Sequence, residues 1–264
     1  MAAVARRPVI GFALSAGGYV FALLIILLTL PAVGPTGDVG RLFDPVGDAF
    51  RAGQPVYVAG VETPFFYAPP WVLLLGALTW LPVEAQLALV WAVNLAALRY
   101  LGGSWLAVGW LAWFPLVAFS LLGATLNIAM AGAIAAGARG VVTPVVGFAF
   151  AKISPILALH PRHWRPALIV SLVLIAVTLP WLQLWPEWAR QLVTYAGSSI
   201  GPQIPVPFLL RLPLAVLLLL LRRPWASALA AVVALPSFYW ESLVVFLAPL
   251  CVYLRRPRGQ RPVA

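Results

Sequence analysis

Long apolar runs, separated by short segments that carry arginine, occupy nearly the whole sequence. The first run, residues 9–33, is about 25 residues long, enough to cross a bilayer with some tilt. Hydrophobic residues make up 63% of the chain and charged residues 9%, whereas soluble domains are nearer half apolar and a quarter charged. Because any soluble fold must expose much of its surface to water, one of this size cannot hide so much apolar surface. The sequence therefore excludes a cytosolic enzyme, a nucleic-acid-binding domain and a secreted disulfide module.

The apolar runs are continuous rather than alternating, which favours membrane helices over a closed β-barrel. We predict an all-α polytopic transmembrane bundle of about ten spans, several of them too short to cross alone. Broken helices are tolerated in membranes where the freed backbone is buried in protein or lines a wet cavity. No internal repeat, soluble domain or low-complexity linker is detectable, so residues 1–264 are expected to form a single integral membrane domain.

The expected spans, whole or in pieces, are residues 9–33, 71–81, 86–98, 104–122 (broken at 114–115), 127–138, 141–159, 167–184, 208–221 and 226–254 (broken at 236–241). The first is interpreted as an uncleaved span, because it is too long for a signal-peptide core and no clear cleavage site follows. The two pieces 226–235 and 242–254 are expected to form a hairpin.

Charge is distributed unevenly along the chain, with 17 basic and seven acidic residues and a net charge of +10. Arginines cluster between apolar runs, at residues 6–7, 162–165, 222–223 and 255–261. By the positive-inside rule these clusters and both chain ends belong in the cytoplasm, the basic tail 255–264 lying at the anionic inner leaflet. Residues 34–68, which hold Asp38, Asp44, Asp48 and Glu62, and residues 185–207 are then outer loops of a multi-pass inner-membrane protein.

The first outer loop is expected to contain a short amphipathic helix. Asp44 is a good N-cap and Pro45 is tolerated at the first helical position, so the helix begins there, runs to about Arg51 and stops at Gly53. Its apolar side chains are expected to lie in the membrane interface: Phe43, Val46, Phe50 and Val56.

Polar residues in or near the membrane are informative because a charge at mid-bilayer costs roughly 2.5 kcal/mol or more. The candidates are Asp38, Arg41, Asn127, Lys152, Arg211 and Glu241. Asn127 follows a Gly-Ala-Thr break and either forms an interhelical hydrogen bond or belongs to a site. Glu241 either caps or pairs locally or faces a ligand.

Lys152, the only lysine, lies within an apolar run beside Ser154-Pro155. It either snorkels to the membrane surface or lines a cavity at a helix break. A simple alternating count of spans puts it on the inner half, whereas a break at Ser154-Pro155 puts it on the outer half. Arg211 likewise either snorkels or binds an anionic group such as a phosphate, which suits a guanidinium fork.

Other chemistries find little support in the sequence. His160 and His163 have no Cys or Glu nearby, so no metal site is predicted there. Neither a Walker motif nor GxGxxG is present, and the single cysteine, Cys251, cannot form an intrachain disulfide. No nucleic-acid partner is expected.

Several motifs occur in a recognisable order. Asp38-Val-Gly-Arg41-Leu-Phe43 is followed by Gly53-Gln-Pro55-Val-Tyr57 and by Tyr67-Ala-Pro69-Pro70. Gly123-Ala-Thr-Leu-Asn127, Lys152-Ile-Ser-Pro155 and Pro236-Ser-Phe-Tyr-Trp-Glu241 come next. Together they resemble the bacterial membrane glycosyltransferases of family 87, a mannosyltransferase-like group with a GT-C fold. The stretch Tyr67-Ala-Pro-Pro stands where the family has Tyr-Pro-Pro, and Ala124 where it has Gln or Asn.

The resemblance implies that the chain transfers a sugar, with mannose the leading candidate, from a polyprenyl-phosphate donor to a glycan or glycolipid acceptor on the outer face. It also implies that the configuration at the anomeric carbon is inverted. It implies Asp38 as the general base and Lys152 and Arg211 as ligands of the donor phosphate. Substrate contacts would fall to Arg41, Tyr67, Asn127 and Glu241. No organic cofactor is expected, and a need for a divalent metal is left open. Two alternatives stay open: a non-catalytic assembly subunit, since the chain is short for the family, and a transporter or flippase for a lipid-linked sugar.

Overall fold

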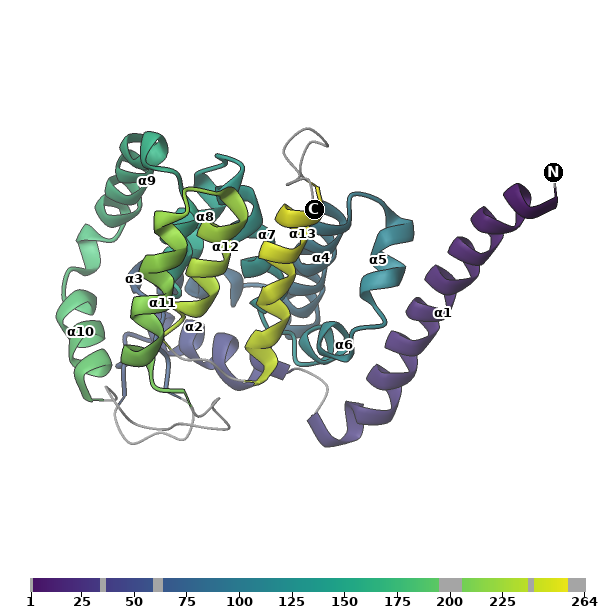
Figure 1. The fold of residues 1–264 in the computed structure, drawn as a ribbon. Helices are drawn as coiled ribbons and strands as arrows, with labels where there is room; N and C mark the ends of the chain where they lie inside the picture. Colours follow the sequence, from purple (N-terminus) through teal and green to yellow (C-terminus); the bar gives the residue numbers. More distant parts are fainter. Residues whose placement is uncertain (1, 34–36, 59–63, 195–205, 237–239, 256–264) are drawn as a thin grey trace.

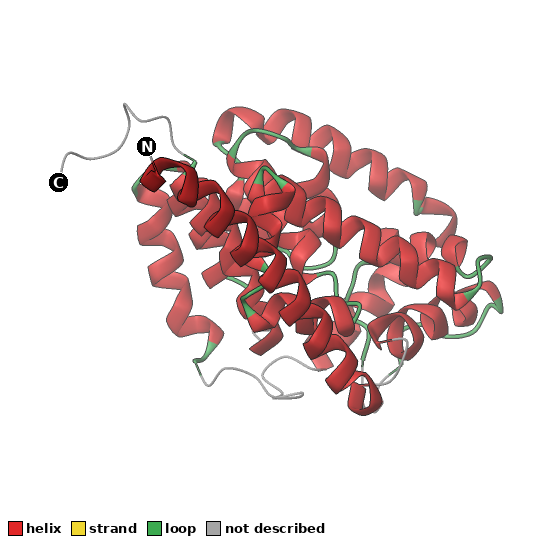
Figure 2. Cartoon of the chain, turned by 90° about the vertical axis from the view of Figure 1, so that its right-hand side faces the viewer, coloured by secondary structure: helices red, strands yellow, loops and turns green. Residues whose placement is uncertain are grey.

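The computed structural model describes residues 2–33, 37–58, 64–194, 206–236 and 240–255, and every regular element in them is a helix (Figures 1 and 2). Two helical stretches are long and apolar enough to cross a membrane: residues 10–28 within α1 (Ala2–Val33), and α4 (Val83–Gly102). A third span results if α5 (Trp105–Leu111) and α6 (Pro115–Leu122) are counted as one, bent by 97° at the predicted break. The all-α membrane class is therefore supported. The predicted number of ten spans is larger than the number of helices long enough to cross a membrane, since the other apolar helices of the described chain have 10–17 residues.

Helix α1 lies at the edge of the molecule (Figure 1). Its small residues Gly18 and Ala22 face Gly109 and Ala112 of the α5 region, and a Cβ added at Gly18 would overlap the Gly109 carbonyl. Close backbone approach through small residues is how membrane helices associate. The other side of α1 leaves large apolar side chains such as Leu28 exposed, as a lipid-facing helix requires.

The centre of the molecule is α7 (Asn127–Ala138), which begins and ends as the sequence predicts. Every residue from 128 to 137 is buried. Helix α4 packs along it, together with α12 (Pro224–Val233) and α13 (Leu247–Leu254). Alanine and glycine dominate α7, so its neighbours approach closely on all sides.

The segment after α7 forms a re-entrant hairpin. Helix α8 (Thr143–Ala149) runs inward, the chain turns at residues 150–153, and the 3-10 helix η2 (Ser154–Ala158) runs back. Gly140 before the hairpin lies against His163 after it, so both limbs return to the same end of the molecule. Of the two alternatives for Lys152, the structure has the break: the chain turns just before Ser154-Pro155, with Lys152 at the tip.

The amphipathic helix in the 34–68 segment is confirmed as α2 (Asp44–Arg51), which follows the π-helix η1 (Val39–Phe43). Gly53 ends it with a φ of +66°. The expected N-cap role of Asp44 is wrong, because η1 continues directly into α2 and the Asp44 carboxylate accepts from Gln86 Nε2 (2.6 Å) instead. The expected position of α2 in the membrane interface is also wrong. The apolar side chains pack inside the protein against α3 (Pro69–Leu78), where Gly76 has no side chain and lets Phe50 approach.

The chain also departs from expectation after residue 167. Helix α9 (Trp164–Val177) ends before the predicted boundary at 184, and the 3-10 turn η4 (Leu179–Trp181) follows. The region predicted as a second outer loop begins with the amphipathic helix α10 (Leu184–Thr194). Trp188 of α10 donates its indole N–H to the Phe66 carbonyl before α3, and Trp185 packs against Phe150 in the turn after α8.

The last third contains α11 (Phe208–Leu220), α12, the 3-10 helix η5 (Trp240–Phe246) and α13. Helices α12 and α13 form the predicted hairpin (Figure 1). Most of its tip and nearly all of the basic tail, at residues 237–239 and 256–264, lie outside the described residues.

Charge separates along the helix axes. The α7–α8 turn, the start of α9 after the 3-10 turn η3 (Pro161–His163), the α11–α12 turn and the end of α13 lie together at the top of Figure 1. They carry basic residues: Arg139, Arg162, Arg165, Arg222, Arg223 and Arg255. The acidic side chains that the structure describes belong to the N-cap of η1, to α2, to the first turn of α4 and to α10, elements that also carry Arg41, Arg51 and Arg190. We call these two regions the basic end and the acidic end.

Candidate functional site

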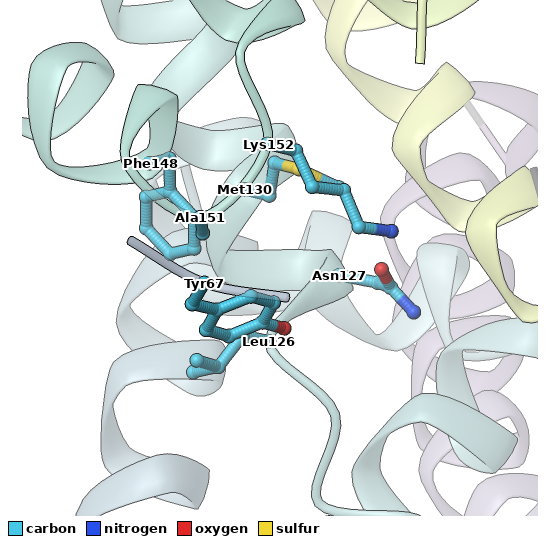
Figure 3. Close-up of a pocket in the computed structure, with 7 residues that line it drawn as sticks. All are labelled: Tyr67, Leu126, Asn127, Met130, Phe148, Ala151 and Lys152. Atoms are coloured by element: carbon cyan, nitrogen blue, oxygen red, sulfur yellow. The ribbon is translucent and has the colours of Figure 1, made fainter. Parts of the chain in front are cut away.

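A small pocket lies where the start of α7, the tip of the α8–η2 hairpin and the residues before α3 meet (Figure 3). Its cavity volume is about 10 Å³, room for about one water molecule, and it opens to the outside. Its lining residues are Tyr67, Leu126, Asn127, Met130, Phe148, Ala151 and Lys152. The structure thus brings together three of the site residues predicted from sequence, although 85 residues of chain separate the first from the last.

The polar atoms of this pocket lie on one side. In Figure 3 the Lys152 ammonium, the Asn127 amide and the Tyr67 hydroxyl project in the same direction, while the other lining side chains are apolar. An ammonium, an amide N–H and a phenol can all donate hydrogen bonds to an oxyanion. Pockets for drug-sized ligands measure roughly 300–1,000 Å³. The cavity volume of this pocket is far smaller, so it encloses no ligand of that size, and its polar groups can contact only one group of a ligand, at the open mouth.

Lys152 owes its position to the hairpin. Its backbone N–H donates to the carbonyl of Phe148 (2.8 Å), which closes the turn after α8. Its side chain is half-buried. The α7 helix of 12 residues rises about 18 Å at 1.5 Å per residue. The tip lies beside the start of α7 and not beside the Arg139 turn at its end, so Lys152 is remote from the basic end.

Asn127 is the first residue of α7, where backbone N–H groups and the helix dipole favour a negative charge. The turn before it is tightly constrained, since Ala124 has a φ of +47°. Such backbone is rare for a residue with a side chain and is held by its surroundings.

Asn94 of α4 forms hydrogen bonds that hold the turn around Ala124 in place. It is fully buried; its Nδ2 donates to the Thr125 carbonyl (2.8 Å), and its Oδ1 accepts from the Ala129 N–H (3.0 Å). One amide thus fastens both sides of the turn that presents Asn127. Sequence reasoning missed this residue. The signal was an asparagine in the middle of an apolar span, where a polar group has to find a partner.

Asp38 lies against the same turn. Its backbone N–H donates to the carbonyl of Gly123 (2.7 Å), and Gly37 is in close contact with that peptide group. The half-buried Asp38 side chain makes no capping hydrogen bond to η1. Asp38 is not among the lining residues of the pocket, but its segment packs directly against the turn that leads to Asn127.

Tyr67 is positioned by an aromatic cluster. Its ring centroid lies 5.2 Å from that of Phe65 and 5.4 Å from that of Trp71. The indole N–H of Trp71 donates to the Gly147 carbonyl (2.9 Å), and the Ala68 N–H donates to the Phe150 carbonyl (2.8 Å). These bonds attach the Tyr67 segment to the limb that carries Lys152.

A tyrosine outside the pocket completes this support. The Tyr57 hydroxyl donates to the Tyr67 carbonyl (2.8 Å). Burial raises the pKa of Tyr57, and the nearby Glu187 carboxylate raises it further, so the phenol stays protonated and remains a donor. Trp188 of α10 adds a bond from its indole N–H to the Phe66 carbonyl (2.8 Å).

Arg211 has other partners. Its guanidinium donates to the carbonyls of Val206, Val233, Leu235 and Pro236 at 2.9–3.4 Å. It thereby satisfies carbonyls at the end of α12, a position where cations are favoured. Arg211 does not line the pocket. It ties α11 to the chain that leads into the Pro236–Glu241 motif.

The remaining predicted residues lie away from the pocket lining. Arg41 is exposed on η1, and the Glu241 side chain lies outside the described part of the structure. In the described ranges no three His, Cys, Asp or Glu side chains come together as metal ligands. At the basic end, Arg162 Nε donates to His163 Nε2 (2.9 Å).

Comparison with protein-family profiles, with curated proteins and with solved structures finds no match to this chain. The motifs and the geometry of the pocket are therefore what indicate a function.

Proposed function

We propose that the chain is a membrane glycosyltransferase of the GT-C type that transfers a sugar, with mannose the leading candidate, from a polyprenyl-phosphate donor. The observation that carries the proposal is the shared pocket of Tyr67, Asn127 and Lys152. These residues come from three motifs of the resemblance to family 87, and the Asp38 motif packs against the turn beside them. Motifs that matched by chance would have no reason to converge at one place.

The pocket suits the donor phosphate. The Lys152 ammonium stabilises the negative charge that develops on the phosphate as the glycosidic bond breaks. The first turn of α7 and the Asn127 amide add further donors. The polyprenyl chain lies outside the pocket, along the exposed apolar helix surfaces, as the small volume requires. We place the acidic end on the outer face of the membrane, because the basic end is then cytoplasmic.

Asp38 is the proposed general base. It takes the proton of the acceptor hydroxyl, whose oxygen attacks the anomeric carbon while the bond to the phosphate oxygen breaks, so that polyprenyl phosphate leaves and the configuration inverts. The backbone bond to Gly123 holds Asp38 next to the donor site. For Arg211 we propose a positioning role rather than phosphate binding, because its guanidinium donates to four backbone carbonyls.

The test is reconstitution of the full chain in liposomes with labelled polyprenyl-phosphate sugars, scoring transfer to an endogenous lipid extract. Asp38→Asn removes the base and keeps the shape, so transfer should fall by about 10²–10⁴-fold while donor binding is retained. Asp48→Asn is the matched control, because Asp48 is exposed on α2 and pairs with Arg51 (3.7 Å). It should transfer at the wild-type rate. Substantial activity in Asp38→Asn would disprove the base assignment.

Lys152 is tested separately from the base. Lys152→Met should weaken donor binding, and Lys152→Arg should restore part of it, because the positive charge returns. If the wild type binds the donor and never transfers the sugar, the protein is an assembly subunit or a transporter. A flipping assay with a fluorescent donor then separates these two.

A further inference from the structure

Three helix ends meet at the basic end of the molecule. Arg139, at the end of α7, places its guanidinium 5.0 Å from the ring centroid of Tyr100, in the last part of α4. Arg255, at the end of α13, donates to the Tyr100 carbonyl (2.8 Å) and lies against Gly103. Two guanidinium groups from distant parts of the sequence thus contact one residue, Arg139 at the ring of Tyr100 and Arg255 at its backbone carbonyl. Arg99, in the last turn of α4, is also exposed.

No acidic side chain of the described residues offsets this charge. Glu84, on the same helix as Tyr100, lies in its first turn, about 24 Å away along the axis at 1.5 Å per residue. The other described acidic residues also belong to the acidic end. The arginines therefore present an uncompensated positive surface to whatever faces this end.

Exposed apolar side chains adjoin the arginines. Leu254, next to Arg255, is 58% exposed, and Trp105, two residues beyond Gly103, is 55% exposed. A soluble anion or a nucleic acid would gain nothing from apolar surface beside its phosphate. A phospholipid would, since its phosphate binds the arginines and its acyl chains contact the apolar side chains.

We infer that the ends of α4, α7 and α13 form a binding site for an anionic phospholipid, with the phosphate between Arg139 and Arg255 and the acyl chains along the neighbouring apolar surface. Basic pockets between membrane helices are suited to such headgroups. The fixed geometry of both arginines on Tyr100 means that little side-chain entropy is lost on binding. The site is remote from the pocket of Lys152 and does not depend on the proposed transfer reaction.

The test is lipid titration of the full chain in detergent, followed by native mass spectrometry, with phosphatidylglycerol and phosphatidylcholine as probes. The wild type should bind phosphatidylglycerol preferentially. Arg139→Gln removes one charge without breaking a backbone hydrogen bond, and should weaken phosphatidylglycerol binding about five-fold, the equivalent of about 1 kcal/mol. Adding Arg255→Gln should bring the loss to about 25-fold.

The matched control is Arg51→Gln. Arg51 also stacks on an aromatic ring, at 4.3 Å from the Trp80 centroid, but it lies at the acidic end and pairs with Asp48. This variant should bind phosphatidylglycerol as the wild type does. Equal binding of the two lipids, or equal loss in Arg51→Gln and Arg139→Gln, overturns the inference. Competition by glycerol phosphate at concentrations similar to the lipid overturns the lipid part of it, because the acyl chains would then contribute nothing.

Discussion

Helix α1 and the α8–η2 hairpin are both apolar runs in the sequence, yet one is a continuous helix and the other is broken. Helix α1 has 32 residues without a break and packs against α5 through glycine and alanine. The hairpin divides its run into pieces of seven and five residues and turns around at Lys152. The first region depends on the volume of its side chains. The second depends on polar groups that hold a broken backbone in place.

The two regions differ in their need for polar residues. A continuous membrane helix satisfies its own backbone, so small side chains that allow close contact are enough. A break leaves N–H and C=O groups that need partners from elsewhere. Asn94, Trp71 and the Ala68 N–H supply partners around the hairpin and the turn before α7. The candidate site lies where these partners gather.

The largest expected effect is in the broken region. Asn94→Leu leaves the Thr125 carbonyl and the Ala129 N–H buried without their bonds, and should lower the free energy of unfolding by about 4 kcal/mol, at 1–3 kcal/mol for each group. Denaturation in mixed micelles measures this change. The control is Gln183→Leu, at an exposed position outside any helix that crosses the core. If Asn94→Leu lowers the free energy of unfolding by less than about 1 kcal/mol, the turn does not depend on the two hydrogen bonds of Asn94.

A smaller effect, of a different kind, is expected in the continuous region. Gly18→Val forces a side chain into the Gly109 carbonyl and should cost about 1–3 kcal/mol, as overpacking does. Gly11→Val is the matched control on the same helix, because nothing lies within 4 Å of a Cβ at Gly11. The same denaturation assay compares them. If both variants unfold alike, α1 is not packed against α5 as described.

The smallest expected effect concerns Tyr57 and its pH dependence. Tyr57→Phe removes the bond to the Tyr67 carbonyl and should cost about 1 kcal/mol near neutral pH. The pKa of Tyr57 is raised in the folded protein, so the folded state keeps its proton above pH 10 while the unfolded state loses it. Wild-type stability should therefore fall more steeply than that of Tyr57→Phe above about pH 10, by at most about 1.4 kcal/mol per pH unit.

Unfolding curves at pH 8 and pH 11 measure this difference. Tyr100→Phe, at the basic end, controls for the general effect of alkali on tyrosines. Parallel curves for the wild type and Tyr57→Phe would show that Tyr57 ionises as an ordinary exposed tyrosine.

Much of the local structure was predictable because its causes are local. Gly53 predicted the end of α2, and Phe114-Pro115 predicted the sharp bend between α5 and α6. The cap expected at Asp44 was wrong, because η1 runs directly into α2. What covers a helix is a different question. The apolar face of α2 was assigned to the membrane interface, whereas Gly76 of α3 provides the space that buries Phe50. A sequence pattern shows that a face is apolar but not what packs against it.

The candidate site was predicted in part for the same reason. The cost of polar groups in membranes singled out Lys152 and Asn127, but the sequence left open which half of the membrane Lys152 occupies, so it did not predict that the two meet. The partners of Arg211 were not predictable, because the carbonyls at the end of α12 come 22 to 25 residues later. Asn94 was overlooked because it belongs to no motif, although its bonds hold the turn.

The position of Asn94 also links the site to the thickness of the surrounding bilayer. Asn94 lies near the middle of α4, a helix long and apolar enough to cross a membrane, and holds the turn before α7 by two bonds. A membrane helix answers a thinner or thicker bilayer by tilting. When α4 tilts, Asn94 carries the first turn of α7 with it and changes the distance between Asn127 and the tip that bears Lys152. Hydrophobic mismatch is thus expected to adjust the pocket without any contact between lipid and pocket residue.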